Sequence, residues 1–481
     1  MGGVIQRDPA AAQEERFDLV IVGAGVHGVA AALDAARRGH RALVIERHDF
    51  GGATSWNSLR VLHGGLRYLQ SLDVARFRES VEARSWFIRE FPDLIEPLPC
   101  LMPLYGRGLR RREVLGPVLA LNEALRRRWS SAEERAFLAE SRVVSASEVV
   151  RWFAGVRQDG LRAGALWYDG LLARPQRVLI EMLRRAVALG AVALNYLEVT
   201  EVRSSDGRVT AIRARDTIDW TEYEFRTEAV LNCAGPWAPA LAATSDPALI
   251  EAFTPSLAFN LLLHHPLDST VSVAVEPAGG GRTYFLHPMG EWTLAGTYHA
   301  TIDEGQDTPS EVQVEDFLAD LRAAIPGFPV TTEHVRRVMS GVLPASRPGS
   351  ADLARRPLFH SAADAGGPEG LHTLVGVKYT TAPLAAARAV AEVLGGTPIP
   401  TAGTPSPPVR DVPGWTAFGL WADRDPEAAG ALIDTIVAKE SVREPDDLLL
   451  RRTDWGLDPR ERNLAEARVR RLRPSLFSPI G

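Results

Sequence analysis

The short stretch His63-Gly64-Gly65-Leu66-Arg67-Tyr68 carries three side chains that could do chemistry. The planar guanidinium of Arg67 can bind two oxygens of a phosphate or carboxylate. The imidazole of His63 can accept a proton, and the hydroxyl of Tyr68 can donate and accept hydrogen bonds. Two adjacent glycines weaken both helices and strands, because glycine loses the most backbone freedom on ordering. We therefore expect a loop that presents these groups.

A nucleotide-binding pattern precedes this stretch. Residues 17–46 show a buried strand, a turn with Gly23, Gly25 and Gly28, a helix and a second strand that ends at Glu46. The first glycine permits the tight turn, the second lets the backbone approach a pyrophosphate, and the third lets the helix pack closely on the strand. The N–H groups at the start of the helix favour phosphates, and Glu46 can accept hydrogen bonds from a ribose. The motif predicts a dinucleotide site without distinguishing FAD from NAD.

Length and composition bound the protein class. The chain has 481 residues, of which 46% are hydrophobic and 24% charged, as expected for a globular protein of two or more domains. The net charge of -6 argues against a dedicated nucleic-acid binder. Only Cys100 and Cys233 are cysteines, which favours a reducing cytoplasm over a disulfide framework. No apolar run reaches the roughly 18 residues of a membrane span. No metal site is expected. Residues 1–16 are expected to form a flexible leader.

Residues 46–70 resemble the FAD-dependent glycerol-3-phosphate dehydrogenases and oxidases, within the amino-acid-oxidase-like flavoproteins. Here "GGATS" at residues 51–55 and "SLRVLHGGLRYLQ" at residues 58–70 match the family pattern "ATS…S…LIHGGLRYL". Three later segments are similar to the family: "AVLNCAGPWA" (229–238), "LVGVKYTTAPLAAARAVAEVLG" (374–395) and "DDLLLRRTDWG" (446–456). The resemblance runs to about residue 460 and implies FAD as the bound dinucleotide.

The pattern and the resemblance together predict an α/β fold. It has a discontinuous Rossmann-type FAD-binding domain, an antiparallel-sheet substrate domain and a small C-terminal helical domain. The expected boundaries are residues 17–100, 165–240 and 340–400 for the FAD-binding domain, 101–164 and 241–339 for the substrate or cap domain, 401–412 for a linker, and 413–481 for the C-terminal domain.

The resemblance also implies which residues form the site. The cofactor-binding set is Gly23, Gly25, Gly28, Glu46, Arg47, Thr54, Ser55, Gly64, Gly65, Ala234, Gly235, Trp237, Gly376, Lys378, Tyr379 and Thr380. The catalytic set is His63, Arg67, Tyr68 and Lys378, and the substrate-binding set is Arg67, Tyr298, His299, Arg347 and Lys378. The glycines of the "HGG" turn are expected to let the backbone pass close to the cofactor. An exposed lysine near a turn is the alternative for Lys378. His63 is a candidate proton acceptor or flavin neighbour, with a structural histidine as the equal alternative, and the Tyr68 hydroxyl can hold the substrate hydroxyl.

The implied reaction is oxidation of a small secondary alcohol by hydride transfer to flavin N5. The implied substrate is sn-glycerol 3-phosphate, giving dihydroxyacetone phosphate, or a related polyol phosphate. Leu343 stands where the family has an arginine, so the substrate stays open, with Arg347 as the candidate replacement. The alternatives are an amine or amino-acid oxidase and a flavin-binding protein with a decayed pocket. The expected electron acceptor is a quinone or oxygen.

The segment 106–130 has a separate interpretation. Arginine clusters flank an apolar run at residues 114–125. We favour an ordinary helix of the substrate domain with solvated arginines, and the alternative is a helix on a membrane surface.

The expected location is the cytoplasm, alternatively at the cytoplasmic face of a membrane. A homodimer is left open.

Overall fold

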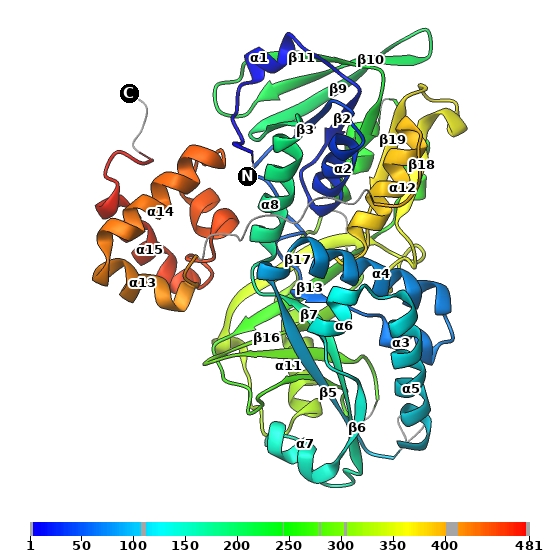
Figure 1. The fold of residues 1–481 in the computed structure, drawn as a ribbon, viewed down its shortest axis with the longest axis vertical. Helices are drawn as coiled ribbons and strands as arrows, with labels where there is room; N and C mark the ends of the chain where they lie inside the picture. Colours follow the sequence, from blue (N-terminus) through cyan, green and yellow to red (C-terminus); the bar gives the residue numbers. More distant parts are fainter. Residues whose placement is uncertain are drawn as a thin grey trace. The chain divides into compact units, whose positions relative to one another are not determined.

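The computed structural model describes residues 3–106, 112–243, 245–278, 280–302, 305–400 and 412–477, without the side chains of residues 70, 112 and 114. The chain divides into two compact units (Figure 1). Unit 1 contains Met1–Trp56, Arg174–Ser256 and Val342–Gly481, and unit 2 contains Asn57–Ala173 and Leu257–Gly341.

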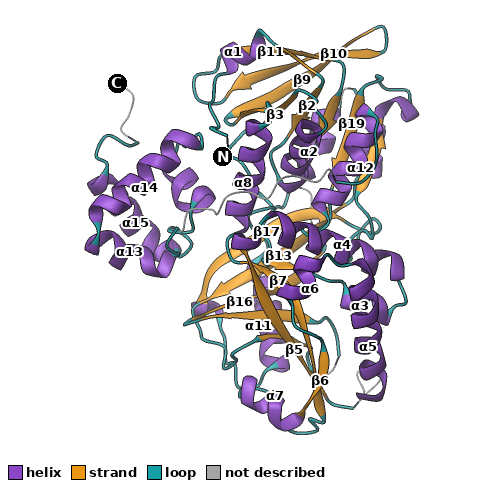
Figure 2. Cartoon of the chain, viewed as in Figure 1, coloured by secondary structure: helices purple, strands orange, loops and turns teal. Residues whose placement is uncertain are grey.

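Unit 1 is built around a six-stranded sheet in the order β18-β19-β12-β2-β3-β8. Its strands are β2 (Leu19–Val22), β3 (Ala42–Ile45), β8 (Val192–Leu194), β12 (Val230–Asn232), β18 (Leu358–Ser361) and β19 (Leu371–Val375). All neighbours pair in parallel except β18 with β19. The helices are α2 (Val26–Arg37), α8 (Pro175–Ala188) and α12 (Ala382–Leu394), and α2 packs against both others (Figure 2). The Rossmann-type prediction is confirmed.

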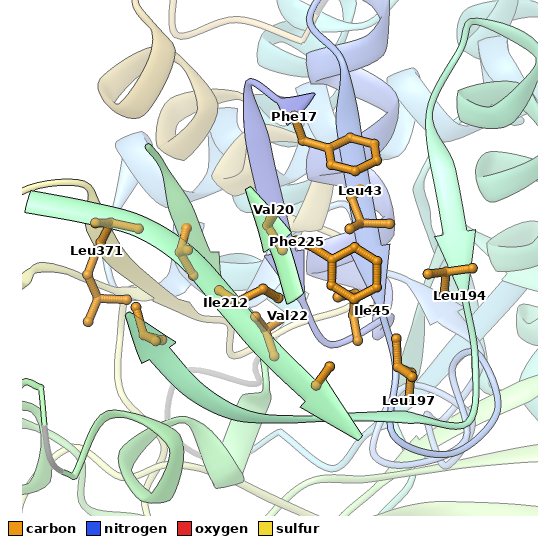
Figure 3. Packing of buried hydrophobic residues seen from close by; sticks show 14 of the residues in the cluster. Phe17, Val20, Val22, Leu43, Ile45, Leu194, Leu197, Ile212, Phe225 and Leu371 are labelled. Atoms are coloured by element: carbon orange, nitrogen blue, oxygen red, sulfur yellow. The ribbon is translucent and has the colours of Figure 1, made fainter. Parts of the chain in front are cut away.

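A second sheet covers the other face of this core. It has the order β1-β11-β10-β9, with β1 (Arg16–Phe17), β9 (Leu197–Ser205), β10 (Arg208–Asp216) and β11 (Glu222–Thr227). Phe225 and Ile212 of this sheet pack with Val20 and Val22 of β2 in one buried cluster (Figure 3). Side chains alternate along a strand, so the equally buried Leu19 and Ile21 face the opposite side. A continuous apolar run such as β2 is typical of a strand covered on both faces.

Unit 2 contains a nine-stranded sheet in the order β17-β13-β16-β15-β14-β5-β7-β4, with β6 paired to β7. The strands are β4 (Val61–Leu62), β5 (Ile95–Leu104), β6 (Arg142–Ser145), β7 (Ala163–Leu172), β13 (Pro255–Leu263), β14 (Ser272–Val275), β15 (Tyr284–Met289), β16 (Trp292–Ala300) and β17 (Val335–Pro344). The helices are α3 (Leu66–Gln70), α4 (Val74–Glu90), α5 (Arg112–Trp129), α6 (Ala132–Phe137), α7 (Ala146–Trp152) and α11 (Glu311–Ala324). Pairing is antiparallel in β5–β7, β13–β16 and β15–β16 and parallel in β5–β14, so the sheet is mixed.

The C-terminal segment is helical, as predicted, and belongs to unit 1. It contains α13 (Trp415–Arg424), α14 (Pro426–Lys439), the π-helical turn η6 (Asp447–Arg452) and α15 (Pro459–Leu472). Phe418 stacks on Trp455 with ring centroids 3.7 Å apart, at the centre of a core formed by these helices. The η6 turn packs against α8.

Some expected boundaries differ from the structure. Residues 3–16 are not a flexible leader, because they form α1 (Pro9–Gln13) and because the buried Ile5 donates its N–H to the carbonyl of Lys439 at 2.9 Å. The first FAD-domain segment ends at Trp56 instead of residue 100, since β4, β5 and α4 belong to unit 2. The proposed linker at 401–412 lies outside the described residues except for the buried Val412.

Helix α5 is covered by its own unit. Leu115 and Leu119 are buried in the core that β5 and β7 form, and Leu125 packs on the cluster around Phe77. The apolar face is thereby used within unit 2, which supports the interpretation as an ordinary helix of the substrate domain. Within the described ranges, no helix is both long enough and apolar enough to cross a membrane.

Candidate functional site

Three glycines form the turn between β2 and α2 for separate steric reasons. Gly23 has φ +97°, in the left-handed region. A Cβ on Gly28 would lie 2.0 Å from the Gly23 carbonyl oxygen, so only glycine lets α2 begin this close to the strand. Gly25 is the N-cap of α2 in an extended conformation. The turn therefore has the close backbone packing that dinucleotide binding requires.

Glu46 and Ser55 are hydrogen-bonded to this turn. The Glu46 carboxylate accepts N–H groups from Ala24 at 2.9 Å and His48 at 3.0 Å. Burial raises the pKa of Glu46, while these two hydrogen bonds act in the opposite direction. Ser55 Oγ accepts the N–H of Val26, the first residue of α2, at 2.9 Å. Glu46 and the "ATS" loop thus lie at the glycine turn, and their contact with a cofactor stays a prediction.

The end of β12 also reaches the turn. A Cβ on Gly23 would lie 2.6 Å from the carbonyl oxygen of Cys233, next to Ala234. The guanidinium of Arg47 lies 4.2 Å from the centroid of the Trp237 ring, which is a cation–π contact. Arg47 and Trp237 lie almost 200 residues apart in the sequence, and together they form one surface beside Glu46. A flat, cationic and aromatic pair is suited to a dinucleotide.

The segment 376–381 contacts the turn through His27. A Cβ on Gly376 would lie 1.8 Å from Cε1 of His27, so the ring packs directly on the Gly376 backbone. Burial lowers the pKa of His27 to about 4, and its buried Nε2 has no hydrogen-bond partner within the described residues. This nitrogen of a neutral ring is available for a hydrogen bond with a polar ligand. Lys378 is partly exposed and Thr380 is buried. The Tyr379 hydroxyl donates to the carbonyl of Pro175 at 2.9 Å, so it serves packing on α8.

In unit 2, "HGGLRY" forms a turn and a short helix instead of the expected loop. Gly65, with φ +82°, is the N-cap of α3. A Cβ on Gly64 would lie 2.1 Å from Nη1 of Arg84, and one on Gly65 would lie 2.9 Å from Cβ of Ser80. Side chains of α4 thus occupy the space that a Cβ at either position would need. The packing of this helix is sufficient to explain both glycines. Their expected closeness to the cofactor stays a prediction.

A buried ion network underlies this turn. Asp169 Oδ1 accepts the Gly64 N–H at 2.6 Å and Nη1 of Arg84 at 2.6 Å. Its Oδ2 accepts the Trp167 indole N–H at 3.0 Å and lies 3.9 Å from Nδ1 of His63. Arg84 also binds Glu134 at 2.6 Å, and all three charged groups of the network are buried. Sequence reasoning missed this network, for which the available signal was a single carboxylate within an apolar strand.

The remaining catalytic candidates of unit 2 lie on α3. Arg67 is exposed, and none of the ion pairs among the described residues involves it. The Tyr68 ring lies under the guanidinium of Arg76 at 4.5 Å. The segment thus offers one cation that could meet an anionic ligand.

The substrate-binding candidates from later in the chain are dispersed. Tyr298 packs against Phe259 and Phe317 on the sheet of unit 2, and the carbonyl of His299 accepts Nη1 of Arg282 at 2.9 Å. Arg347 lies exposed in unit 1, beyond the end of β17. Its expected role as a replacement for the family arginine at position 343 stays a prediction.

The predicted residues fall into two groups. Unit 1 carries Gly23, Gly25, Gly28, Glu46, Arg47, Thr54, Ser55, Ala234, Gly235, Trp237, Arg347, Gly376, Lys378, Tyr379 and Thr380. Unit 2 carries His63, Gly64, Gly65, Arg67, Tyr68, Tyr298 and His299. Most of the cofactor set thus lies in the unit that holds the dinucleotide turn.

Known proteins resemble this chain over most of its length. Residues 18–393 match the family described as FAD dependent oxidoreductase. The chain is 32% identical over 375 residues to glycerol-3-phosphate dehydrogenase 1 of Mycobacterium tuberculosis H37Rv, covering 76% of this chain and 70% of that protein. It is 27% identical over 388 residues to a glycerol-3-phosphate dehydrogenase of Synechocystis, covering 77% and 68%. It spans about half (51%) of the mitochondrial glycerol-3-phosphate dehydrogenase of Mus musculus, at 28% identity over 76% of this chain.

Solved structures share the fold. The glycerol-3-phosphate dehydrogenase from Bacillus halodurans, complexed with FAD, superposes with a TM-score of 0.70 at 19% identity, covering 97% of this chain and 92% of that one. The L-proline dehydrogenase from P. horikoshii superposes with a TM-score of 0.57 at 15% identity, covering 80% and 95%. At these identities the likeness establishes architecture and leaves the substrate open.

Proposed function

Because this chain belongs to the family of FAD dependent oxidoreductases, we propose that it oxidises sn-glycerol 3-phosphate or a related polyol phosphate. FAD is its cofactor, and the glycine turn, Glu46 and the Arg47–Trp237 pair of unit 1 would hold the dinucleotide. The curated relatives that carry the name glycerol-3-phosphate dehydrogenase support the substrate class. Bound FAD would supply the acceptor for the hydride that leaves the substrate carbon.

The observation that carries the proposal is the pairing of His63 with Asp169. His63 accepts the substrate hydroxyl proton at one ring nitrogen, and the buried carboxylate 3.9 Å from Nδ1 stabilises the cation that forms. The Gly64 N–H and Arg84 both bind this carboxylate, so the carboxylate beside the histidine is fixed in position. This arrangement is suited to oxidation of an alcohol, because an alcohol must lose its O–H proton.

Arg67 of unit 2 is assigned to the substrate anion. Arg67 offers a planar fork for two phosphate oxygens from α3, and the Tyr68 hydroxyl orients the substrate hydroxyl. Lys378 is a cation of unit 1, and its role in binding a phosphate or in departure of the proton stays a prediction. Leu343 supplies no charge, so the proposal includes polyol phosphates other than glycerol 3-phosphate.

Anaerobic bleaching of the bound flavin tests the substrate class. The purified holoenzyme is mixed with glycerol 3-phosphate, other polyol phosphates, unphosphorylated glycerol, proline and glycine. We expect bleaching by a polyol phosphate and not by glycerol. Bleaching only by proline or glycine would contradict the proposal and identify an amine or amino-acid oxidase. Lack of bleaching by every compound would indicate a pocket without oxidase function.

The electron acceptor is proposed to be a quinone or oxygen. Oxygen consumption and reduction of a soluble quinone analogue, measured with the substrate that bleaches the flavin, distinguish them. Binding of the holoenzyme to anionic vesicles checks membrane association at the cytoplasmic face. Because α5 uses its apolar face within unit 2, we expect little binding through that helix.

A further inference from the structure

One loop of unit 1 is attached to the dinucleotide turn at two points. It runs from Asp49 to Trp56, immediately after Glu46, and we refer to residues 49–56 as the turn-support loop. The Gly51 N–H donates to the carbonyl of Ala24 at 3.0 Å. The N–H of Val26 donates to Ser55 Oγ at 2.9 Å. The position of the turn that receives the pyrophosphate therefore depends on the position of this loop.

The C-terminal helical segment holds the first residue of the turn-support loop. Arg452, the last residue of η6, binds Asp49 through two parallel hydrogen bonds, Nη1 to Oδ2 at 2.5 Å and Nη2 to Oδ1 at 2.8 Å. Asn195 donates to Oδ1 of the same carboxylate at 2.9 Å. The Arg452 side chain is fully buried and also donates from Nε to the carbonyl of Glu440 at 3.0 Å. A two-point ion pair of this kind fixes orientation as well as distance.

The neighbouring arginine holds the last residue of the same loop. The guanidinium of Arg451 lies 4.8 Å from the centroid of the buried Trp56 ring. A Cβ on Gly52 would lie 3.3 Å from Nε of Arg451, so the loop backbone passes directly beside this side chain. Its buried Nη1 has no hydrogen-bond partner within the described residues. Arg451 therefore acts on the loop mainly by stacking and close packing.

The two contacts come from one turn of π-helix. The η6 turn packs on α8, and Gln176 of α8 donates to the carbonyl of Thr453 at 3.0 Å. π-helical turns are frequently found at functional sites. The η6 backbone thus presents Arg451 and Arg452 together from a fixed base.

We propose that η6 is a working part of the FAD site, in which Arg451 and Arg452 are positioning residues that hold the turn-support loop against the dinucleotide turn. The C-terminal helical segment thereby determines FAD affinity, although it carries none of the predicted cofactor-binding residues. Loss of either contact frees the loop, which withdraws Ser55 and Gly51 from the turn and raises the dissociation constant for FAD. The proposal is independent of which alcohol the enzyme oxidises.

FAD titration of the FAD-free full-length protein, followed by flavin fluorescence, tests the proposal. We expect Arg451→Ala to raise the dissociation constant by about tenfold or more. The matched control is Arg473→Gln, which removes an arginine with an equivalent two-point pair to Asp434 in the same helical segment, away from the loop. This control should leave the FAD dissociation constant within about twofold of wild type, although it can lower the melting temperature.

Hydrogen exchange separates positioning from general destabilisation. Amides of residues 49–56 should exchange faster in Arg451→Ala and remain protected in Arg473→Gln. Arg452→Gln removes a two-point pair, as Arg473→Gln does, and should also raise the dissociation constant. If Arg452→Gln does not fold, Asp49→Asn weakens the same pair from the loop side and should have the same effect. An Arg451→Ala protein that folds and binds FAD within about twofold of wild type would overturn the proposal.

Discussion

Asp169 and Arg84 form a buried ion pair, Oδ1 to Nη1 at 2.6 Å, that fixes the backbone of the "HGG" turn. The same oxygen accepts the Gly64 N–H, and Nη1 occupies the space where a Cβ of residue 64 would lie. The pair thus fixes Gly64, the residue after His63, and the second oxygen of Asp169 lies 3.9 Å from Nδ1 of His63. Asp169 and Arg84 are therefore proposed positioning residues for the proton acceptor.

Asp169→Asn should lower the free energy of unfolding by about 3 kcal/mol, because it leaves the buried Arg84 with only part of its compensating charge. Urea unfolding of the FAD-free protein measures this change. Glu315→Gln is the control, since Glu315 pairs with Arg322 on the exposed face of α11 and should cost no more than about 0.5 kcal/mol. Equal losses for both variants would contradict the importance of the buried pair.

Gly64→Ala should destabilise the protein by about 2 kcal/mol or more, because the new methyl group would meet the Arg84 guanidinium at 2.1 Å. The reference substitution is Gly327→Ala at an exposed position without a positive φ, where the nearest atom would be the carbonyl oxygen of Gly155 at 3.7 Å. Alanine has less backbone freedom to lose on folding, so this variant should be neutral or more stable by up to about 1 kcal/mol. Thermal unfolding of both proteins makes the comparison. The idea fails if Gly64→Ala melts like wild type.

Arg67→Ala should raise KM for a polyol phosphate by about tenfold or more with a smaller effect on kcat, because it removes a cation that binds the substrate phosphate. Steady-state kinetics with the substrate identified by flavin bleaching provides the measurement. Arg78→Ala on α4 is the matched control, since Arg78 is exposed and pairs with Glu82. An unchanged KM in Arg67→Ala would place Arg67 outside the substrate contacts.

The unfolding free energy should depend on pH through His27. Burial lowers its folded pKa to about 4, whereas the ordinary value is 6.5. Between these values the unfolded chain binds more protons, so His27 makes the protein less stable as pH falls from about 6.5 towards about 4. His27→Gln removes this dependence. As pH falls from about 6.5 to about 4, the unfolding free energy of the variant should therefore rise relative to that of wild type by up to about 3 kcal/mol. Urea unfolding of both FAD-free proteins at several pH values measures the difference between their unfolding free energies. A difference that stays the same at every pH would contradict the prediction.

Local patterns predicted much of unit 1 correctly. The glycine turn, the flanking strands and Glu46 are encoded within about 30 residues, because each has its own steric or hydrogen-bonding requirement. Adjacent glycines disfavour regular structure and therefore predict a loop at the "HGGLRY" stretch. It contains α3 because Gly65 serves as a left-handed N-cap, which adjacent glycines do not reveal by themselves.

The sequence by itself determined the dinucleotide-binding turn, and it supplied the "HGGLRY" residues as candidates for the substrate chemistry. Tertiary structure alone decided which charged groups support these motifs. Asp169 is 85 residues from Arg84, and Asp49 is 403 residues from Arg452. No periodicity links such partners, because a buried charge is stabilised by whichever opposite charge folding brings to it. Candidate functional residues are therefore readable from short motifs, while the charged groups that hold these motifs in place are selected by burial.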